Sequence, residues 1–265
     1  MPEALGLVQV LGGLATGILA GAMGGLLGVS PGGALVPALA LMPGLGQHDA
    51  QAISLAAQLL PTSLAGFVRY RVAGHVASWR TVTWISLGFL AGAFIGAKGA
   101  SHLADAALRW MFVAYLLVLA TLVLWRSTAN ASGVAQAGEP HAAAVALLAV
   151  GIVAGASSGL LGIGGGLAIT ALMTVALHWS QHRSQAVSLA VNALPLALPA
   201  VLVYASVANG LPWLLLGCVV LGLWVGTAAG AQLATRLDER VLRKYFVVMV
   251  LGMALLMAWR ASSAG

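Results

Sequence analysis

The sequence predicts an all-α polytopic membrane protein that consists of two inverted-topology repeats. Three observations lead to this fold class. Hydrophobic residues make up 61% of the 265 residues and charged residues only 7%, whereas soluble domains have about 25% charged residues. Apolar runs of about 20 residues, the length that crosses a bilayer as a helix, recur along the chain. The second half of the sequence also repeats the first half.

The charge pattern argues against a soluble nucleic-acid-binding protein. The net charge is +6, but the basic residues lie between apolar runs, where they determine membrane topology. We therefore expect the lipid bilayer, and no nucleic acid, as a partner. Strands of an outer-membrane barrel would be shorter and alternate in polarity, a pattern that this sequence lacks. The first 20 residues contain no Lys or Arg, so we expect no cleavable signal peptide.

One module occurs twice along the chain. The stretch "QHDAQAISLAAQLLP" at 47–61 aligns with "QHRSQAVSLAVNALP" at 181–195, with nine identities in fifteen positions. Likewise, "GLLGVSPGG" at 25–33 aligns with "GLLGIGGGL" at 159–167, and both pairs have the same offset of 134 positions (181 − 47 and 159 − 25). We expect a first membrane repeat over 1–126, a linker over 127–141 and a second repeat over 142–265, in one integrated membrane domain.

Each repeat begins with a long apolar segment, a glycine-rich break and a short apolar segment. The long segments cover 4–27 and 142–161, and the short ones cover 34–45 and 167–178. A helix of about 12 residues is about 18 Å long, which is too short for a hydrocarbon core of about 30 Å. The two segments therefore form either a re-entrant hairpin with its turn inside the membrane, or a full helix followed by a short tilted one.

Three spanning segments complete each repeat. They are expected near 50–70, 80–98 and 106–125, and again near 184–205, 213–232 and 241–259. With one or two segments before them in each repeat, the total is eight to ten membrane segments. Rows of glycine at every fourth position are expected to let helices pack closely. These rows are Gly17, Gly21 and Gly25, and Gly88, Gly92 and Gly96.

Loop charges indicate that the repeats have opposite orientations. The loop 69–80 has three arginines, and its counterpart 203–214 has no charge. The reverse holds for the next loop, because 233–243 has three arginines and its counterpart 99–109 has one. Basic loops stay in the cytoplasm, so non-equivalent loops of the two repeats face the same side. Inverted repeats with broken helices are typical of secondary transporters, whose site lies at the repeat interface near the midplane.

The glycine breaks are the candidate binding site. Each short helix begins just after a break, so its free N–H groups and partial positive charge favour an anion. Glycine lets the backbone approach a ligand, Ser30 adds a hydroxyl donor, and Pro31 suits a helix start. The expected substrate-binding residues are Gly28, Ser30, Gly32, Gly33 and Gln58 in the first repeat, and Gly162, Gly164, Gly165, Gly166 and Asn192 in the second.

A polar helix face is expected after each short segment, with residues at i, i+3 and i+7. Such residues either line a pathway or form hydrogen bonds between helices, and the deepest, Gln58 and Asn192, favour a pathway. A proline at the same place in each repeat is expected to kink the helix. The secondary pathway residues are Gln51, Ser54 and Thr62 with Gln185 and Ser188, and the kink prolines are Pro61 and Pro195.

The stretch "GVSPG" at 28–32 also fits G-x-S-x-G, the pattern of a hydrolase nucleophile elbow. That elbow needs a strand before the serine, whereas a membrane helix is expected here. The second repeat has Gly164 at the place of the serine, and the nearest histidines, His48 and His75, lie beyond intervening segments. An intramembrane serine hydrolase is therefore a remote alternative, and we expect the protein not to be an enzyme.

These motifs resemble the sulfite exporter TauE/SafE family of membrane transporters. The resemblance rests on "GLLGVSPGGALVPAL" and "GLLGIGGGLAITAL", followed at the same distance by "AQAISLAAQLLPTSLAG" and "SQAVSLAVNALPLALPA". It implies a bacterial inner-membrane permease for small sulfur-containing anions such as sulfite, sulfoacetate or other organosulfonates. The second repeat departs from the first by having Gly164 and Gly165 where the first has Ser30 and Pro31, so the two sides of the site are unequal.

The positions of the acidic residues indicate how transport is driven. All six lie in predicted loops or near segment ends, so no buried carboxylate is expected to bind a proton or sodium. A negative cell interior favours anion exit by about 2.3 kcal/mol per charge per 100 mV. We therefore expect export by alternating access, without a cofactor or bound metal. An ion-coupled uptake permease, or a channel for another small solute, is the alternative.

Overall fold

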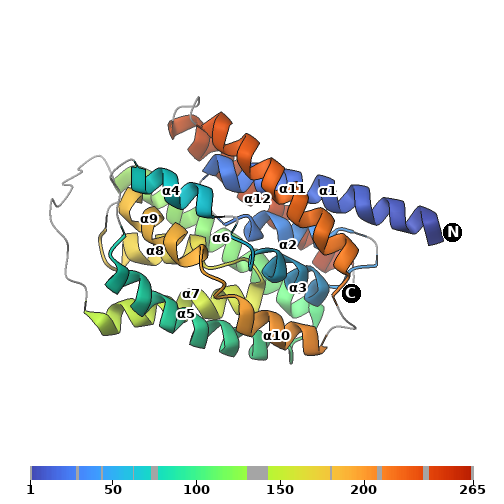
Figure 1. Ribbon diagram of the computed structural model, residues 1–265, viewed down its shortest axis with the longest axis horizontal. Coiled ribbons are helices and arrows are strands. Elements are labelled where there is room, and N and C mark those ends of the chain that lie inside the picture. Colours follow the sequence, from blue (N-terminus) through green and yellow to red (C-terminus); the bar gives the residue numbers. More distant parts are fainter. Residues whose placement is uncertain are drawn as a thin grey trace.

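The computed structural model describes residues 2–27, 30–42, 44–61, 63–72, 77–129, 143–179, 181–207, 211–234 and 239–263. Across these residues the regular structure is helical, as predicted. The long helices α1 and α11 lie along one side of the bundle and α5 and α7 along the opposite side, with the short helices α2, α3, α8 and α9 between them (Figure 1). The helices are α1 (Pro2–Leu27), α2 (Gly32–Ala40), α3 (Gln47–Ala57), α4 (Leu64–Val72), α5 (Trp79–Ala100), α6 (Asp105–Ala129), α7 (Ala144–Leu161), α8 (Gly166–Val175), α9 (Gln181–Asn192), α10 (Leu198–Val207), α11 (Trp213–Ala234) and α12 (Glu239–Ser263).

The order of long and short helices is the same in α1–α6 and in α7–α12. Both α5 and α11 have 22 residues, and both α6 and α12 have 25 residues. The most extensive helix contacts join α1 with α11 and α5 with α7, followed by α6 with α12. Each of these pairs joins a helix of one half of the chain to a helix of the other half, so the long helices of the two halves are interleaved.

Glycine rows make these long contacts close, as the sequence predicted. A Cβ atom added to Gly92 on α5 would lie 2.1 Å from the carbonyl oxygen of Ile152 on α7. A Cβ atom added to Gly17 on α1 would lie 2.3 Å from the carbonyl oxygen of Val219 on α11. Only glycine permits this approach of two helix backbones, which is a common mode of packing between membrane helices.

Two predicted spanning segments are broken into pairs of short helices, and this corrects the expectation of single kinked helices over 50–70 and 184–205. In the first, α3 ends at Ala57 and α4 begins at Leu64; in the second, α9 ends at Asn192 and α10 begins at Leu198. Pro61 and Pro195 lie inside the breaks. Proline has no N–H to donate, and it also disfavours the helical conformation of the preceding residue. The helices therefore end before each proline and begin again after it.

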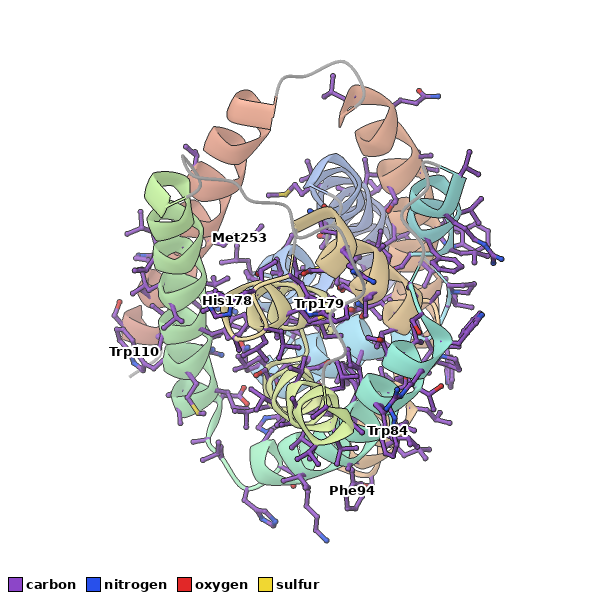
Figure 2. All side chains as sticks on the ribbon, turned by 90° about the vertical axis from the view of Figure 1, so that its left-hand side faces the viewer. Trp84, Phe94, Trp110, His178, Trp179 and Met253 are labelled. Carbon is purple, nitrogen blue, oxygen red and sulfur yellow. The ribbon has the colours of Figure 1, made fainter. Side chains whose placement is uncertain are left out.

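Three helices in the described part of the chain are long and apolar enough to cross a membrane: Trp79–Ala100, Ala144–Leu161 and Trp213–Gly230. Their outward faces are apolar, since Val145 is 77% exposed and Trp213 is 74% exposed. Figure 2 shows Phe94 and Trp110 pointing away from the bundle, and both side chains are exposed. An extended surface of large apolar side chains suits contact with lipid better than contact with water.

Candidate functional site

The two glycine turns lie against each other at the centre of the bundle. The first turn joins α1 to α2, and the second, residues 162–165, joins α7 to α8. A Cβ atom added to Gly32 would lie 2.3 Å from the carbonyl oxygen of Ile163, and one added to Gly166 would lie 3.2 Å from the backbone nitrogen of Ser30. The start of each short helix therefore contacts the opposite turn.

The second turn contains two glycines in a left-handed conformation. Gly162 and Gly164 both have a φ of +71°, a left-handed conformation that favours glycine. Gly162 also ends α7 with a bond from its N–H to the carbonyl oxygen of Ser158 at 2.7 Å. Ser30 occupies the position equivalent to Gly164. The equivalent positions of the two turns therefore have different residues, a serine with a hydroxyl donor and a glycine with a left-handed backbone.

A chain of hydrogen bonds joins the end of α3 to both turns. The Ser30 hydroxyl donates to Gln58 Oε1 at 2.5 Å, with the carbonyl oxygen of Ile163 as a more distant acceptor at 3.3 Å. The Gln58 amide donates to the carbonyl oxygen of Ser54 at 3.0 Å. The Ser54 hydroxyl, which is fully buried, donates to the carbonyl oxygen of Gly162 at 2.7 Å. Gln58 and Ser54 therefore hold the first turn to the second.

The equivalent side chains of the second repeat make contacts within their own half. The Ser188 hydroxyl donates to the carbonyl oxygen of Gly166 at 2.9 Å. The Asn192 amide donates to the carbonyl oxygen of Ser188 at 2.8 Å. Its nitrogen would lie 3.2 Å from a Cβ atom added to Gly166. Gln58 and Asn192 thus lie at equivalent places beside the turns, each with its amide nitrogen bonded to its own helix.

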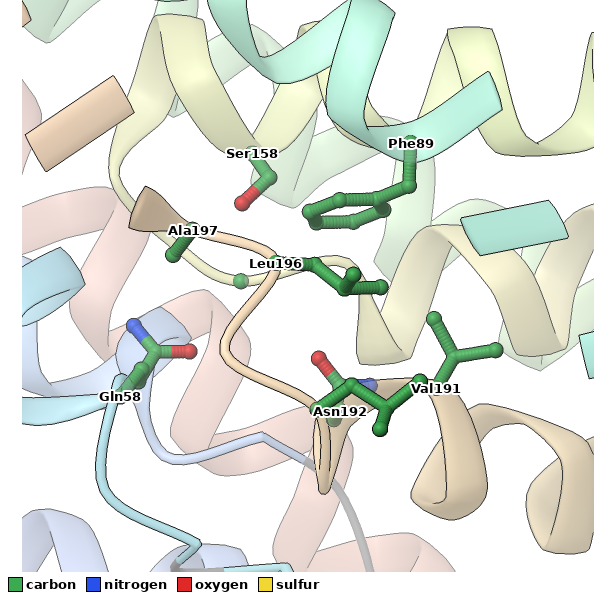
Figure 3. A pocket seen from close by; sticks show the side chains of 9 residues that line it. Gln58, Phe89, Ser158, Val191, Asn192, Leu196 and Ala197 are labelled. Carbon is green, nitrogen blue, oxygen red and sulfur yellow. The ribbon is translucent and has the colours of Figure 1, made fainter. Parts of the chain in front are cut away.

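A small cavity lies between these two amides (Figure 3). Its volume is about 10 Å³, which is room for about one water molecule. A polyatomic anion would fit there only after the lining side chains move, so the cavity is closed to such an anion in this structure. The cavity is lined by Gln58, Phe89, Ser158, Gly164, Val191, Asn192, Leu194, Leu196 and Ala197, none of which has a charged side chain.

Ser158 and Phe89 belong to this site although the sequence did not suggest them. Ser158 is fully buried, and its hydroxyl oxygen has no hydrogen-bond partner within the described part of the protein. Figure 3 shows this hydroxyl beside Phe89, directed toward the cavity. The position equivalent to Ser158 in the first repeat is Gly24, so comparison of the repeats gave no signal. A polar residue inside an apolar run was the only available hint.

Some of the predicted pathway residues lie away from the cavity. Gln51 is fully buried, and its Oε1 accepts a hydrogen bond from the Tyr204 hydroxyl at 2.7 Å. Gln185 is half-buried and does not line the cavity. Gly33 faces Leu167 across the junction of the two short helices. Pro61 and Pro195 are exposed, Gly165 packs against the Phe89 ring, and Gly28 and Thr62 lie outside the described residues.

The contacts of Ser30 do not suit a nucleophile. A catalytic serine needs a base within hydrogen-bond reach, but the contacts of the Ser30 hydroxyl are with the Gln58 amide and a backbone carbonyl. His48 instead contacts Asp105 and the carbonyl oxygen of Ala100, and His75 lies outside the described residues. These contacts argue against the hydrolase alternative.

Comparison with known proteins shows which family of proteins this chain is similar to. A family model described as sulfite exporter TauE/SafE matches residues 13–257, which include both glycine turns. The chain is also similar to a protein of Xylella fastidiosa (strain 9a5c) described as a probable membrane transporter protein. The two are 24% identical over 253 residues, which cover 91% of this chain and 93% of that protein. No solved structure matches the chain.

Proposed function

Because the chain belongs to the sulfite exporter TauE/SafE family of membrane transporters, we propose that it exports a small sulfur-containing anion, such as sulfite or an organosulfonate like sulfoacetate. The anion binds between the two glycine turns, at the starts of α2 and α8. One observation supports this site above the others: the two helix starts lie against opposite turns, beside a buried Ser158 hydroxyl with no partner in the described protein.

Backbone dipoles supply the attraction for the anion at this site. The first N–H groups of a helix have no acceptor within the helix, and each helix start has the equivalent of about half a positive charge. The Ser158 hydroxyl and the amides of Gln58 and Asn192 line the cavity as further donors. The Ser30 hydroxyl donates to Gln58 in this structure and becomes a donor for the anion when Gln58 moves. A sulfite or sulfonate group spreads its charge over several oxygens, so it suits many weak donors better than one full positive charge.

Alternating access of two inverted repeats is the mechanism that we propose. The exchange of long helices between the halves, α1 with α11 and α5 with α7, supports a pseudo-two-fold arrangement. The arginine-rich loops 69–80 and 233–243 occupy different positions in the two repeats, which supports opposite orientations of the repeats in the inner membrane. In this mechanism the amides of Gln58 and Asn192 move away from Ser54 and Ser188, which opens the cavity to one side at a time. The membrane potential then drives the anion outward.

Substitution of the turn glycines by alanine tests the site. A Cβ at Gly32 would lie 2.3 Å from a backbone oxygen, which no side-chain movement relieves, whereas at Gly166 the contacts are 3.2 Å. We expect Gly32→Ala to abolish flux of labelled sulfite from proteoliposomes and Gly166→Ala to reduce it less. Gly217→Ala is the matched control, because no atom lies within 4 Å of its added Cβ.

Insertion and folding of each variant are checked by size-exclusion chromatography and thermal unfolding before flux is compared. The proposed site is wrong if a folded Gly32→Ala protein transports sulfite as fast as Gly217→Ala.

A further inference from the structure

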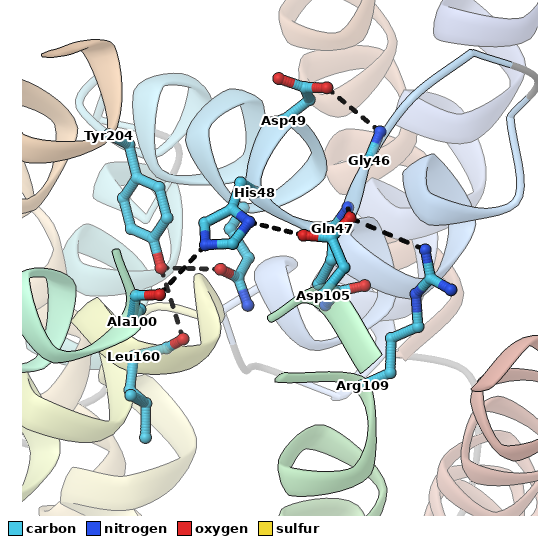
Figure 4. Close-up of polar contacts among 10 residues, drawn as sticks. Gly46, Gln47, His48, Asp49, Ala100, Asp105, Arg109, Leu160 and Tyr204 are labelled. Carbon is cyan, nitrogen blue, oxygen red and sulfur yellow. Dashed lines mark hydrogen bonds and ion pairs between the residues drawn. The ribbon is translucent and has the colours of Figure 1, made fainter. Parts of the chain in front are cut away.

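Two titratable side chains, His48 at the start of α3 and Asp105 at the start of α6, contact each other (Figure 4), and neither lines the cavity. Nδ1 of His48 is 2.5 Å from Oδ1 of Asp105, and Nε2 of His48 is 3.0 Å from the carbonyl oxygen of Ala100. Oδ2 of Asp105 also accepts a hydrogen bond from the backbone N–H of Gln47 at 2.8 Å. The His48 ring therefore bridges α3 to the end of α5 and to the start of α6.

The partners of the ring determine how many protons this bridge holds. A carbonyl oxygen only accepts, so the contact with Ala100 needs a hydrogen on Nε2. The contact with Asp105 needs a second hydrogen, which lies either on Nδ1 of an imidazolium or on a protonated carboxyl. Both arrangements have the same count, one proton more than a neutral histidine and a carboxylate. Release of that proton leaves two acceptors facing each other, so the bridge depends on the bound proton.

Two buried side chains connect this pair to the second glycine turn. The centroid of the His48 ring is 6.1 Å from that of Tyr204 on α10. The Tyr204 hydroxyl is 2.7 Å from Gln51 Oε1 and 2.9 Å from the carbonyl oxygen of Gly159, at the end of α7. Gln51 in turn lies directly against Gly162, since a Cβ added to Gly162 would be 2.8 Å from its Cα and Cβ atoms. These contacts give a continuous packed path from His48 to the second turn, along which a shift of α3 would act.

The charged groups around the pair come from several elements. Arg109 on α6 is nearly buried, and its guanidinium lies 3.8 Å from Oδ2 of Asp105. On α3 itself, the Asp49 carboxylate accepts from the N–H of Gly46 at 3.1 Å. At the end of α5, Lys98 is exposed beside the Phe94 ring, and His102 is exposed in the following turn. Asp105 is 37% exposed, so protons from water can reach the pair.

The sequence has the same residue types in the other half of the chain. Six residues in or around the His48–Asp105 contact each have a counterpart 134 positions away, the same offset that relates the repeats. For example, Gln47 corresponds to Gln181 (181 − 47) and Tyr204 to Tyr70 (204 − 70). The aspartate becomes a glutamate, whereas the adjacent Asp49 becomes Arg183. Retention of the group in both copies of the module is expected for a role in the movement of each module. Gln47, His48, Gln51, Asp105, Arg109 and Tyr204 correspond to Gln181, His182, Gln185, Glu239, Arg243 and Tyr70.

We propose that His48 and Asp105 form a proton-binding site that is linked to the opening of the transporter. The proton is bound in the closed form described above, and it passes to water when the bridge between α3, α5 and α6 opens. The link to transport rests on the proposed function, whereas the proton site itself does not. Because only the deprotonated bridge opens, anion flux rises with pH below the midpoint of the titration.

The protonation state is tested by ¹⁵N NMR of the full-length protein labelled at histidine. We expect the resonances of His48, identified by their loss in His48→Gln, to show the extra proton that the closed bridge requires and the release of that proton as the pH is raised. His102→Gln is the matched control, because it makes the same change in a nearby exposed residue. If His48→Gln does not fold, the His48 resonances are identified instead by their shift in Asp105→Asn, which removes the carboxylate that contacts Nδ1. A neutral His48 ring beside an ionised Asp105 at every pH at which the protein is folded would overturn the proton site.

The link to transport is tested by flux of labelled sulfoacetate, whose sulfonate keeps its charge across the pH range, with equal pH on both sides of proteoliposomes. One linked proton predicts a rise approaching tenfold per pH unit, about 1.4 kcal/mol per unit, below the midpoint. His48→Gln removes this rise and His102→Gln retains it. Titration of His48 with pH-independent wild-type flux would overturn the link. Titration of His48 without any flux would instead contradict the proposed function and leave the proton site intact.

Discussion

Replacement of Ser158 by alanine should weaken anion binding while it stabilises the empty protein. The Ser158 hydroxyl is buried against the cavity and has no hydrogen-bond partner within the described residues. Most buried hydroxyls in proteins are hydrogen-bonded, so this one is costly to the empty protein. An anion in the cavity would give it an acceptor. Removal of the hydroxyl therefore lowers the affinity for the anion and raises the stability of the empty protein. A serine with a purely structural role would not produce this combination.

The magnitudes follow from the exposure and contacts of the hydroxyl. A hydrogen bond to a charged group contributes about 1.5–3 kcal/mol, and an unsatisfied buried polar group costs about 1–3 kcal/mol. Loss of the bond to the anion corresponds to an increase of the sulfite Kd by about 10- to 150-fold. In the absence of ligand, the free energy of unfolding should rise by about 1–3 kcal/mol. Calorimetric titration with sulfite and ligand-free thermal unfolding measure the two quantities separately.

Ser157→Ala is the matched control for this experiment. Its hydroxyl donates to the carbonyl oxygen of Val153 at 2.8 Å within the same helix, on the outer side of α7. Substitutions at such positions change stability by about 0.5 kcal/mol or less. A Ser158→Ala protein that binds sulfite as tightly as Ser157→Ala, or that unfolds more easily, would refute the assignment of Ser158 to the anion site.

Three further predictions follow from the buried contacts. Tyr204→Phe removes the hydroxyl that contacts Gln51 Oε1 and the carbonyl oxygen of Gly159. We therefore expect the free energy of unfolding to fall by about 1–3 kcal/mol. Thermal unfolding that matches wild type would show that this contact does not stabilise the protein. Gly92→Ala places a Cβ 2.1 Å from the carbonyl oxygen of Ile152, and this overpacking should lower the free energy of unfolding by about 1–3 kcal/mol. Gly99→Ala is the control and should be tolerated, because no atom lies within 4 Å of its added Cβ. Equal melting temperatures for the two variants would contradict the close packing of α5 on α7. Asp105 lies just before the predicted spanning segment 106–125. Burial alone would raise the pKa of its carboxyl group, but hydrogen bonds from the Gln47 N–H and from His48, together with the charges of His48 and Arg109, lower this pKa below the usual 3.8. The stabilisation by ionised Asp105 is therefore complete above that pH and is lost as the pH falls through the lower pKa of the folded protein. At pH values below about 4, the melting temperature should decrease in wild type and decrease less in Asp105→Asn. The same acid dependence in both proteins would exclude this role of Asp105.

The sequence was sufficient for the parts of the fold that depend on periodicity and repetition. Glycine at every fourth position predicted close helix contacts, and the contacts of Gly17 and Gly92 with opposite backbones agree. The doubled glycine motif predicted two turns that meet, and Gly32 does lie against Ile163. Both signals reflect backbone geometry that only glycine permits, which is why they can be recognised from residue type alone.

The remaining features depend on tertiary contacts that spacing does not encode. Pro61 indicated a disturbance of the helix, but whether a proline kinks or ends a helix depends on the partners available to the freed carbonyl groups. Ser158 has no polar counterpart in the first repeat, and its role depends on the cavity around it. The pairing of His48 with Asp105 joins residues 57 positions apart, and no spacing in the sequence indicates that these two residues meet.

Flux of labelled sulfite from proteoliposomes under a clamped membrane potential tests the central claim, that the paired glycine turns form the binding site of an anion exporter. Sulfoacetate, taurine and sulfate serve as competitors, and Gly32→Ala provides the inactive protein. The account predicts efflux that increases with the imposed potential, is reduced by sulfoacetate and is absent in Gly32→Ala. Efflux that follows an imposed sodium gradient and ignores the potential, or that is unchanged in Gly32→Ala, would contradict it.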